Sequence, residues 1–150
     1  MEKQEGLLFR LSGQQGSCPE TAGGDPVPNF FKDIEIIDSG VKGKALRCLP
    51  TQLLAYWAPG NIYSQQGTVA FFWRSRTPLG ETEFPLFRVS FADHSSWDAL
   101  FMRIDYNGGG IDAFVTDINL SRLRISHKFE TLPSPKQWFH IAFTWDETVG

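Results

Sequence analysis

The sequence is poor in clustered positive charge and in long apolar runs, and each shortage excludes a class of partner. The 14 Lys and Arg residues are outnumbered by 17 Asp and Glu residues, for a net charge of −3. Scattered basic residues build no face of the kind that phosphate backbones require, so nucleic acid is excluded as an expected partner. No apolar run approaches the roughly 18 residues of a membrane-spanning helix, so no membrane partner is expected either.

Cysteine is also scarce, with Cys18 and Cys48 the only two. Paired, they would close a loop of about 31 residues, worth roughly 3–4 kcal/mol in the chain-entropy model. Unpaired, they would serve as small apolar side chains. Residues 1–5 are polar and charged, which is not the pattern of a signal peptide. Both a cytoplasmic protein and one whose signal has been removed fit these observations.

Helical periodicity is missing as well, and alternation with a period of two takes its place. Large apolar and aromatic residues are plentiful, including 13 Phe and 5 Trp, which rules out a disordered chain. The alternation predicts strands around residues 7–11, 33–36, 68–73, 87–91, 100–105, 111–115, 123–125 and 141–145. Gly- and Pro-rich turns separate these runs, among them 107–110, and residues 12–30 are expected to form a surface loop. A length of 150 residues therefore predicts one all-β domain, residues 1–150, built as an antiparallel sandwich or barrel.

Three motifs resemble the laminin-G-like, concanavalin A-like domain family. Residues 137–146, QWFHIAFTWD, are similar to its W-x-H-[IV]-A-x-[TS]-[WY]-[DN] strand, and residues 67–73, GTVAFFW, to its G-[TS]-[IVL]-x-F-W strand. Residues 39–46 resemble the G-x-x-G-x-A-L segment that precedes them. The motifs stand in the family's order and cover about 110 residues. The resemblance implies a jelly-roll sandwich of two antiparallel sheets, found outside the cell or in the periplasm, that binds glycans or proteins.

The sequence departs from that family after Trp145 and Asp146. The family continues with further strands, one of which lies beside the N-terminal strand, whereas this sequence stops at Gly150. The departure predicts exposed strand edges, and with them a C-terminally incomplete domain, a partner chain or self-association.

Carboxylates offer two candidate chemistries. Asp33, Glu35 and Asp38 repeat the E-x-D-x-x-E spacing of laminarinase-type glycosidases, but Asp stands where that mechanism uses Glu. With Ile34 and Ile36 directed inward, these acids are expected to face water, so the chain is not expected to be an enzyme. Asp93, Asp117 and Asn119 are candidate ligands for Ca²⁺, which prefers oxygen donors. The alternative is a set of solvated loop carboxylates, and both interpretations remain open.

Aromatic residues in polar loops give the strongest indication of function, because sugar rings stack on Trp and Tyr. We expect a non-catalytic, lectin-like module that binds a glycan or polysaccharide, as an accessory part of a secreted carbohydrate-active or adhesion protein. One alternative is core packing for the same aromatics, and another is a protein-interaction module that uses exposed edge strands, with another protein or a second copy as partner. A polar face made by Arg88, Arg103 and Asp105 is also expected, either as part of the site or as a solvated sheet surface. The expected ligand contacts are Trp57, Asp93, His94, Trp97, Asp105, Tyr106, Asn107 and Asp117.

Overall fold

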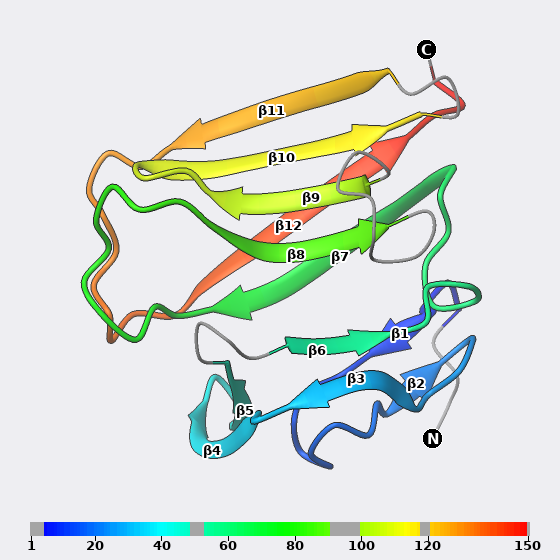
Figure 1. Ribbon diagram of the computed structural model, residues 1–150, viewed down its shortest axis with the longest axis horizontal. Helices are drawn as coiled ribbons and strands as arrows, with labels where there is room; N and C mark the ends of the chain where they lie inside the picture. The colour runs from blue at the N-terminus through cyan, green and yellow to red at the C-terminus, as the bar shows by residue number, and fades with distance from the viewer. Residues whose placement is uncertain (1–4, 49–52, 91–99, 118–120, 150) are drawn as a thin grey trace. The chain divides into compact units, whose positions relative to one another are not determined.

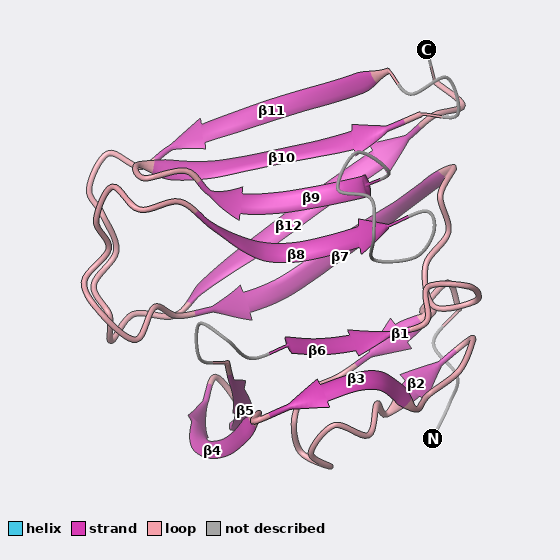
Figure 2. Cartoon of the chain, in the orientation of Figure 1, coloured by secondary structure: helices cyan, strands magenta, loops and turns pink. Residues whose placement is uncertain are grey.

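A computed structural model of the chain describes residues 5–48, 53–90, 100–117 and 121–149. It divides into two compact units, Met1–Tyr63 and Ser64–Gly150. In the described residues every regular element is a β-strand and every strand pair is antiparallel (Figures 1 and 2). The all-β prediction is thus confirmed, while the prediction of a single domain stays a prediction.

The first unit consists of three strand pairs. β1 (Phe9–Arg10) pairs with β2 (Thr21–Ala22), and β3 (Pro28–Lys32) pairs with β6 (Leu53–Tyr56). β4 (Glu35–Gly40) and β5 (Gly43–Arg47) form a hairpin, in which Gly43 has a φ of 84°. Positive φ at the start of β5 suits glycine, which has no Cβ to clash with the backbone.

Asn61 holds the turn that ends this unit. Its side-chain oxygen accepts a hydrogen bond from the backbone N–H of Gly24 at 2.9 Å. Its side-chain nitrogen donates to the carbonyl oxygens of Asp25 and Trp57, both at 2.9 Å. One amide therefore links the segment before β3 to the turn after β6, which explains why these residues lie together without a regular strand.

The second unit contains a four-stranded sheet in the order β11-β10-β9-β8. Its strands are β8 (Phe84–Ser90), β9 (Leu100–Tyr106), β10 (Gly110–Thr116) and β11 (Arg122–Lys128). β7 (Gln66–Trp73) and β12 (Phe139–Asp146) form a separate pair that crosses behind this sheet (Figure 1).

Aromatic contacts join these two layers. The Trp73 ring of β7 lies 6.0 Å from that of Phe84 and 6.4 Å from that of Tyr106, measured between centroids. The Trp145 ring of β12 lies 6.0 Å from that of Phe101. Large flat side chains bury much area and prefer such tilted arrangements. The core of this unit therefore sits between the β7–β12 pair and strands β8 and β9.

Several sequence expectations need correction in the first unit. Ile34 is buried as expected, but Ile36 is 50% exposed and does not form an inward pair with it. The expectation was wrong because β4 begins only at Glu35, after Asp33 with a φ of 50°, so alternation does not run through residues 33–36. The expected loop over residues 12–30 also contains β2 and the first part of β3.

Candidate functional site: a polar hollow beside the β9–β10 turn

Strand register divides the four-stranded sheet into two chemically different faces. Met102, Ile104 and Tyr106 of β9 point toward β7 and β12 and are completely buried. The alternate residues point to the opposite side, which we call the outer face. Because the side-chain period of a strand is two, the register fixes this division wherever pairing is regular. Bulges in the β8–β9 ladder interrupt it, and Phe101, beside one of them, contacts Trp145 of β12.

The outer face carries polar residues in cross-strand rows. Asp105 of β9 pairs with Asp112 of β10, which pairs with Ser126 of β11. The next row lies two residues away along β9, β10 and β11. In it Arg88 of β8 pairs with Arg103 of β9, Arg103 with Phe114 of β10, and Phe114 with Arg124 of β11. The expected polar face of Arg88, Arg103 and Asp105 therefore exists, and it extends over β10 and β11.

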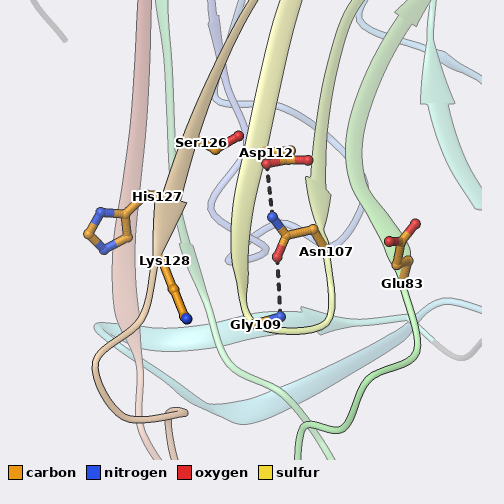
Figure 3. A pocket seen from close by; sticks show the side chains of 7 residues that line it. All are labelled: Glu83, Asn107, Gly109, Asp112, Ser126, His127 and Lys128. Atoms are coloured by element: carbon orange, nitrogen blue, oxygen red, sulfur yellow. Dashed lines mark hydrogen bonds between the residues drawn. The ribbon is translucent and has the colours of Figure 1, made fainter.

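Turn geometry places Asn107 beside the row of Asp105, Asp112 and Ser126, which we call the acidic row. The side-chain nitrogen of Asn107 donates a hydrogen bond to Oδ1 of Asp112 at 2.8 Å, and its side-chain oxygen accepts one from the N–H of Gly109 at 3.2 Å. Gly108 has a φ of 87°, which a turn of this shape requires. Figure 3 shows Asn107 held on both sides by these bonds. The amide is fixed by its neighbours before any ligand arrives.

A shallow hollow opens at this end of the sheet, and its lining includes both outer-face residues and His127, the register partner of the inward-facing Ile111. In Figure 3 the side chain of Glu83, which precedes β8, lies on one side of Asn107, and those of His127 and Lys128 lie on the other. Carboxylates offer hydrogen-bond acceptors only, lysine offers donors only, and serine and asparagine offer both. The hollow thus presents both kinds of group to a ligand. Its lining consists of Glu83, Asn107, Gly109, Asp112, Ser126, His127 and Lys128.

The two carboxylates of the acidic row differ in their surroundings. Hydrogen bonds from Ser126 and Asn107 stabilise the charged form of Asp112 and lower the pKa of its carboxyl. Burial raises the pKa of Asp105, and the nearby Arg103, with which it forms an ion pair, only partly opposes this. Asp112 lines the hollow, whereas Asp105 lies outside its lining and forms an ion pair with Arg103.

The structure brings together only part of the expected ligand set. Asp105 and Asn107 lie in the acidic row and at its end, as described above. Tyr106 is fully buried and donates its hydroxyl hydrogen to the carbonyl of Gly80 at 2.8 Å, so its ring has no free face for a sugar. Asp117 lies at the other end of β10, where its side chain accepts a hydrogen bond from the N–H of Ser121 at 2.8 Å.

The other expected contacts stay predictions. Trp57 is 57% exposed and belongs to the first unit. Asp93, His94, Trp97 and Asn119 lie outside the described residues. In the part of the chain that is described, no three His, Cys, Asp or Glu side chains gather as a metal site would require. The calcium ligands expected from the sequence therefore stay a prediction.

Asp112, Ser126, Lys128 and Glu83 were missing from the expected ligand set. Counting backward and forward from the glycine-rich turn at 107–110 would have paired Asp105 with Asp112, because a hairpin turn fixes the register of its strands. Ser126 and Lys128 are placed by the second ladder, between β10 and β11, and the sequence between these two strands carries no comparable signal. The spacing of Asp33, Glu35 and Asp38 that resembles a glycosidase motif has no support from the positions of these side chains. All three are exposed, and Glu35 forms an ion pair with Arg47 at 3.0 Å.

Comparison of the chain with protein-family models, curated proteins and solved structures gives no significant match. The likeness to laminin-G-like domains consequently rests on the three sequence motifs alone. Among the described residues, no helix has the length and apolar character needed to cross a membrane.

Proposed function

We propose that the chain is a non-catalytic carbohydrate-binding module that acts outside the cell, with the hollow at the β9–β10 turn as its glycan site. The observation that carries this proposal is the Asn107–Asp112 pair, which is held in place at an accessible hollow on a sheet face. Sugar hydroxyls both donate and accept hydrogen bonds, and a charged acceptor beside a fixed amide can bind two neighbouring hydroxyls. Pockets with a few convergent polar groups are the usual form of a small-ligand site.

The motif resemblance supports the same proposal, because laminin-G-like and concanavalin A-like domains commonly bind glycans. We further propose that the two layers of the second unit form part of a jelly-roll sandwich of this kind. Their facing aromatic rings and the antiparallel pairing of all described strands support that arrangement.

The test is binding of the purified chain to a panel of immobilised glycans and polysaccharides, in buffer with Ca²⁺ and again with a chelator. We expect a selective signal that falls at least about tenfold in Asp112→Ala and in Asn107→Ala, a loss of about 1.4 kcal/mol. Asp38→Ala, on β4 of the first unit, serves as the matched acidic control and should bind as the parent does. Loss of signal with the chelator would assign a role to Ca²⁺.

Two results would overturn the proposal. One is a blank panel from protein that is folded by circular dichroism. The other is selective binding that survives both Asp112→Ala and Asn107→Ala, which would move the glycan site to another part of the chain.

A further inference from the structure

Arginine side chains gather around one aromatic ring of the outer face. Phe114 of β10 lies between Arg103 of β9 and Arg124 of β11, its register partners. The guanidinium carbon of Arg122, two residues before Arg124 on β11, lies 5.4 Å from the centre of the Phe114 ring. Arg88 of β8 pairs with Arg103 and extends the same row. We call these four arginines the arginine cluster.

Positive charge exceeds negative charge along this face. On the described strands, the outer face carries the arginine cluster and Lys128 against the carboxylates of Asp105 and Asp112. Asp105 forms an ion pair with Arg103 through Nε. Asp112 instead accepts hydrogen bonds from Asn107 and Ser126. The surplus of positive charge makes the arginine side of this face complementary to an anion.

Two members of the cluster lie together in spite of their like charge. Arg88 and Arg103 are register partners, and both are partly buried. Like charges directly opposite each other on a sheet are destabilising. Burial and the neighbouring Arg103 both lower the pKa of Arg88, and Asp105 opposes this only in part. An anion bound beside the pair would relieve the repulsion.

Hydrogen-bond donors are available on the other side of Phe114. Arg124 is exposed and forms no hydrogen bond or close ion pair with the residues that the structure describes, and it acts on Asp112 only through its charge. A guanidinium presents its N–H groups in a rigid, planar fork that fits two oxygens of one carboxylate or of a tetrahedral oxyanion. Arg124 can therefore hold an oxyanion without breaking any contact of the folded chain.

A buried hydroxyl lies at the end of the cluster. Thr116 is the register partner of Arg122 and stands on the same side of β10 as Phe114. It is only 1% exposed, and its Oγ1 has no hydrogen-bond partner within the described ranges. Since buried polar groups are nearly always paired, an oxygen acceptor beside Arg122 would complete this one as well.

The cluster adjoins the hollow. Asp112 and Ser126 line the hollow, and Phe114 and Arg124 follow them two residues along β10 and β11, about 7 Å away. Asp112 is a charged acceptor, so it favours hydroxyl groups and repels acidic groups. One ligand can satisfy both places if it has hydroxyls at one point and an acidic group at a neighbouring point.

We propose that the arginine cluster binds the carboxylate or sulfate group of an acidic glycan whose hydroxyl groups occupy the hollow. This inference rests on the proposed function and names the class of glycan. An inorganic oxyanion has the same acidic chemistry but no sugar hydroxyls for Asn107 and Asp112, so it should bind more weakly.

The test uses two pairs of polymers that differ only in their acidic groups. One pair is polygalacturonate and its methyl ester, and the other is dextran sulfate and dextran. Isothermal titration of the whole chain at one salt concentration should show at least one acidic polymer binding about tenfold or more tightly than its neutral counterpart. The preference should shrink as salt is added, because salt screens charges at the surface.

Variants of the chain locate the acidic group. Arg124→Ala and Arg122→Ala remove exposed guanidinium groups, so both should fold and should each reduce the preference for the acidic polymer about tenfold. Arg76→Ala, between β7 and β8, changes the net charge equally at another exposed position and should keep the preference of the parent. Arg103 is left intact, because its loss would leave the half-buried Asp105 without its ion pair.

Three outcomes would overturn the inference. One is equal binding of the acidic and neutral polymers, and the glycan site would still stand if this binding required Asp112. Another is a loss in Arg76→Ala as large as in Arg124→Ala, which would reduce the effect to net charge. The third is displacement of the acidic polymer by sodium sulfate or sodium acetate at the concentration of its own acidic groups, which would make a free ion the ligand.

One further outcome separates the inference from the proposed function. Binding of the acidic polymer that Arg124→Ala weakens, but that Asp112→Ala and Asn107→Ala leave unchanged, would overturn the glycan site in the hollow. The arginine cluster would then stand as an anion site by itself.

Discussion

Gly67 faces the indole ring of Trp145 across the β7–β12 pair, and the absence of its side chain makes room for that ring. A Cβ built on Gly67 would lie 2.7 Å from an indole carbon of Trp145. The indole in turn donates its N–H to the carbonyl oxygen of Ser64 at 2.9 Å, so it cannot move without losing a hydrogen bond. The glycine at the start of the GTVAFFW motif therefore has a packing role.

Replacing Gly67 by alanine should lower the free energy of unfolding by about 1–3 kcal/mol, the usual cost of overpacking. Urea unfolding followed by tryptophan fluorescence measures this. Gly80→Ala is the control, because a Cβ there meets nothing within 4 Å, and it should change stability by less than about 0.5 kcal/mol. Equal effects of the two substitutions would contradict the packing role.

Asp105 and Asp112 are register partners whose carboxyl groups should titrate in opposite directions from the ordinary pKa of about 4. A raised pKa means that the folded chain binds the proton more readily, so the contribution of Asp105 to stability falls as the pH rises just above 4. A lowered pKa means that the contribution of Asp112 is present above pH 4 and is lost as the pH falls below it. Carboxyl-carbon resonances followed from pH 2 to pH 7 measure both. A midpoint for Asp112 above that of Asp105 would refute this assignment.

At the scale of elements, burial on the side of the sheet opposite the outer face falls from β9 to β11, which predicts unequal costs for the same type of substitution. Ile104→Ala should cost about 2–5 kcal/mol, as buried large-to-small changes do. Ile125→Ala, two strands away on the same face, should cost less than about 1 kcal/mol because its side chain is already 63% exposed. Denaturant unfolding of both variants checks this, and a large cost at Ile125 would show that its side chain is covered in solution.

Strand alternation predicted the elements of the second unit well, and those of the first unit poorly. The runs at 68–73, 100–105 and 141–145 each became a strand, because one face of each packs against a neighbouring layer and alternation records that burial. In the first unit strands are short, and both residues of β1 and β2 are only partly buried or exposed. Residues with no fully buried face show no alternation, so β2, β5 and β6 left no signal.

The candidate site was predictable only where one turn controls it. Asn107 and Asp105 stand close to a glycine-rich turn, and the sequence predicted both as contacts. Asn107 lines the hollow, whereas Asp105 lies in the adjoining row, outside the lining. The register between β9 and β10 brings Asp112 to them. Ser126 and Lys128 are placed by the register between β10 and β11, which no turn motif in the sequence specifies. Tyr106 illustrates the reverse error, because an aromatic residue next to a loop can still point into the core.

At the scale of the whole molecule, stability should not depend on redox conditions. Cys18 and Cys48 are both free and exposed, although the sequence left their pairing open. The midpoint of thermal unfolding should therefore be the same with and without a reductant. A disulfide closing this loop would be worth roughly 3–4 kcal/mol, and its reduction would lower the midpoint by about 10 °C. Alkylation of the native protein should modify both thiols, and protection of both would contradict this prediction.

The rows of the outer face also give the sheet a direction. Asp112 and Ser126 form one row, and Arg124 extends the next, about 7 Å further along the strands. A linear polymer lying along β10 and β11 would meet a carboxylate and a hydroxyl first and a guanidinium second, and reversing the polymer would reverse that order. Since the two ends of a polysaccharide are chemically different, such a surface distinguishes its two orientations. If the proposed glycan is a linear polymer, this face would thus favour one direction of the polymer over the other.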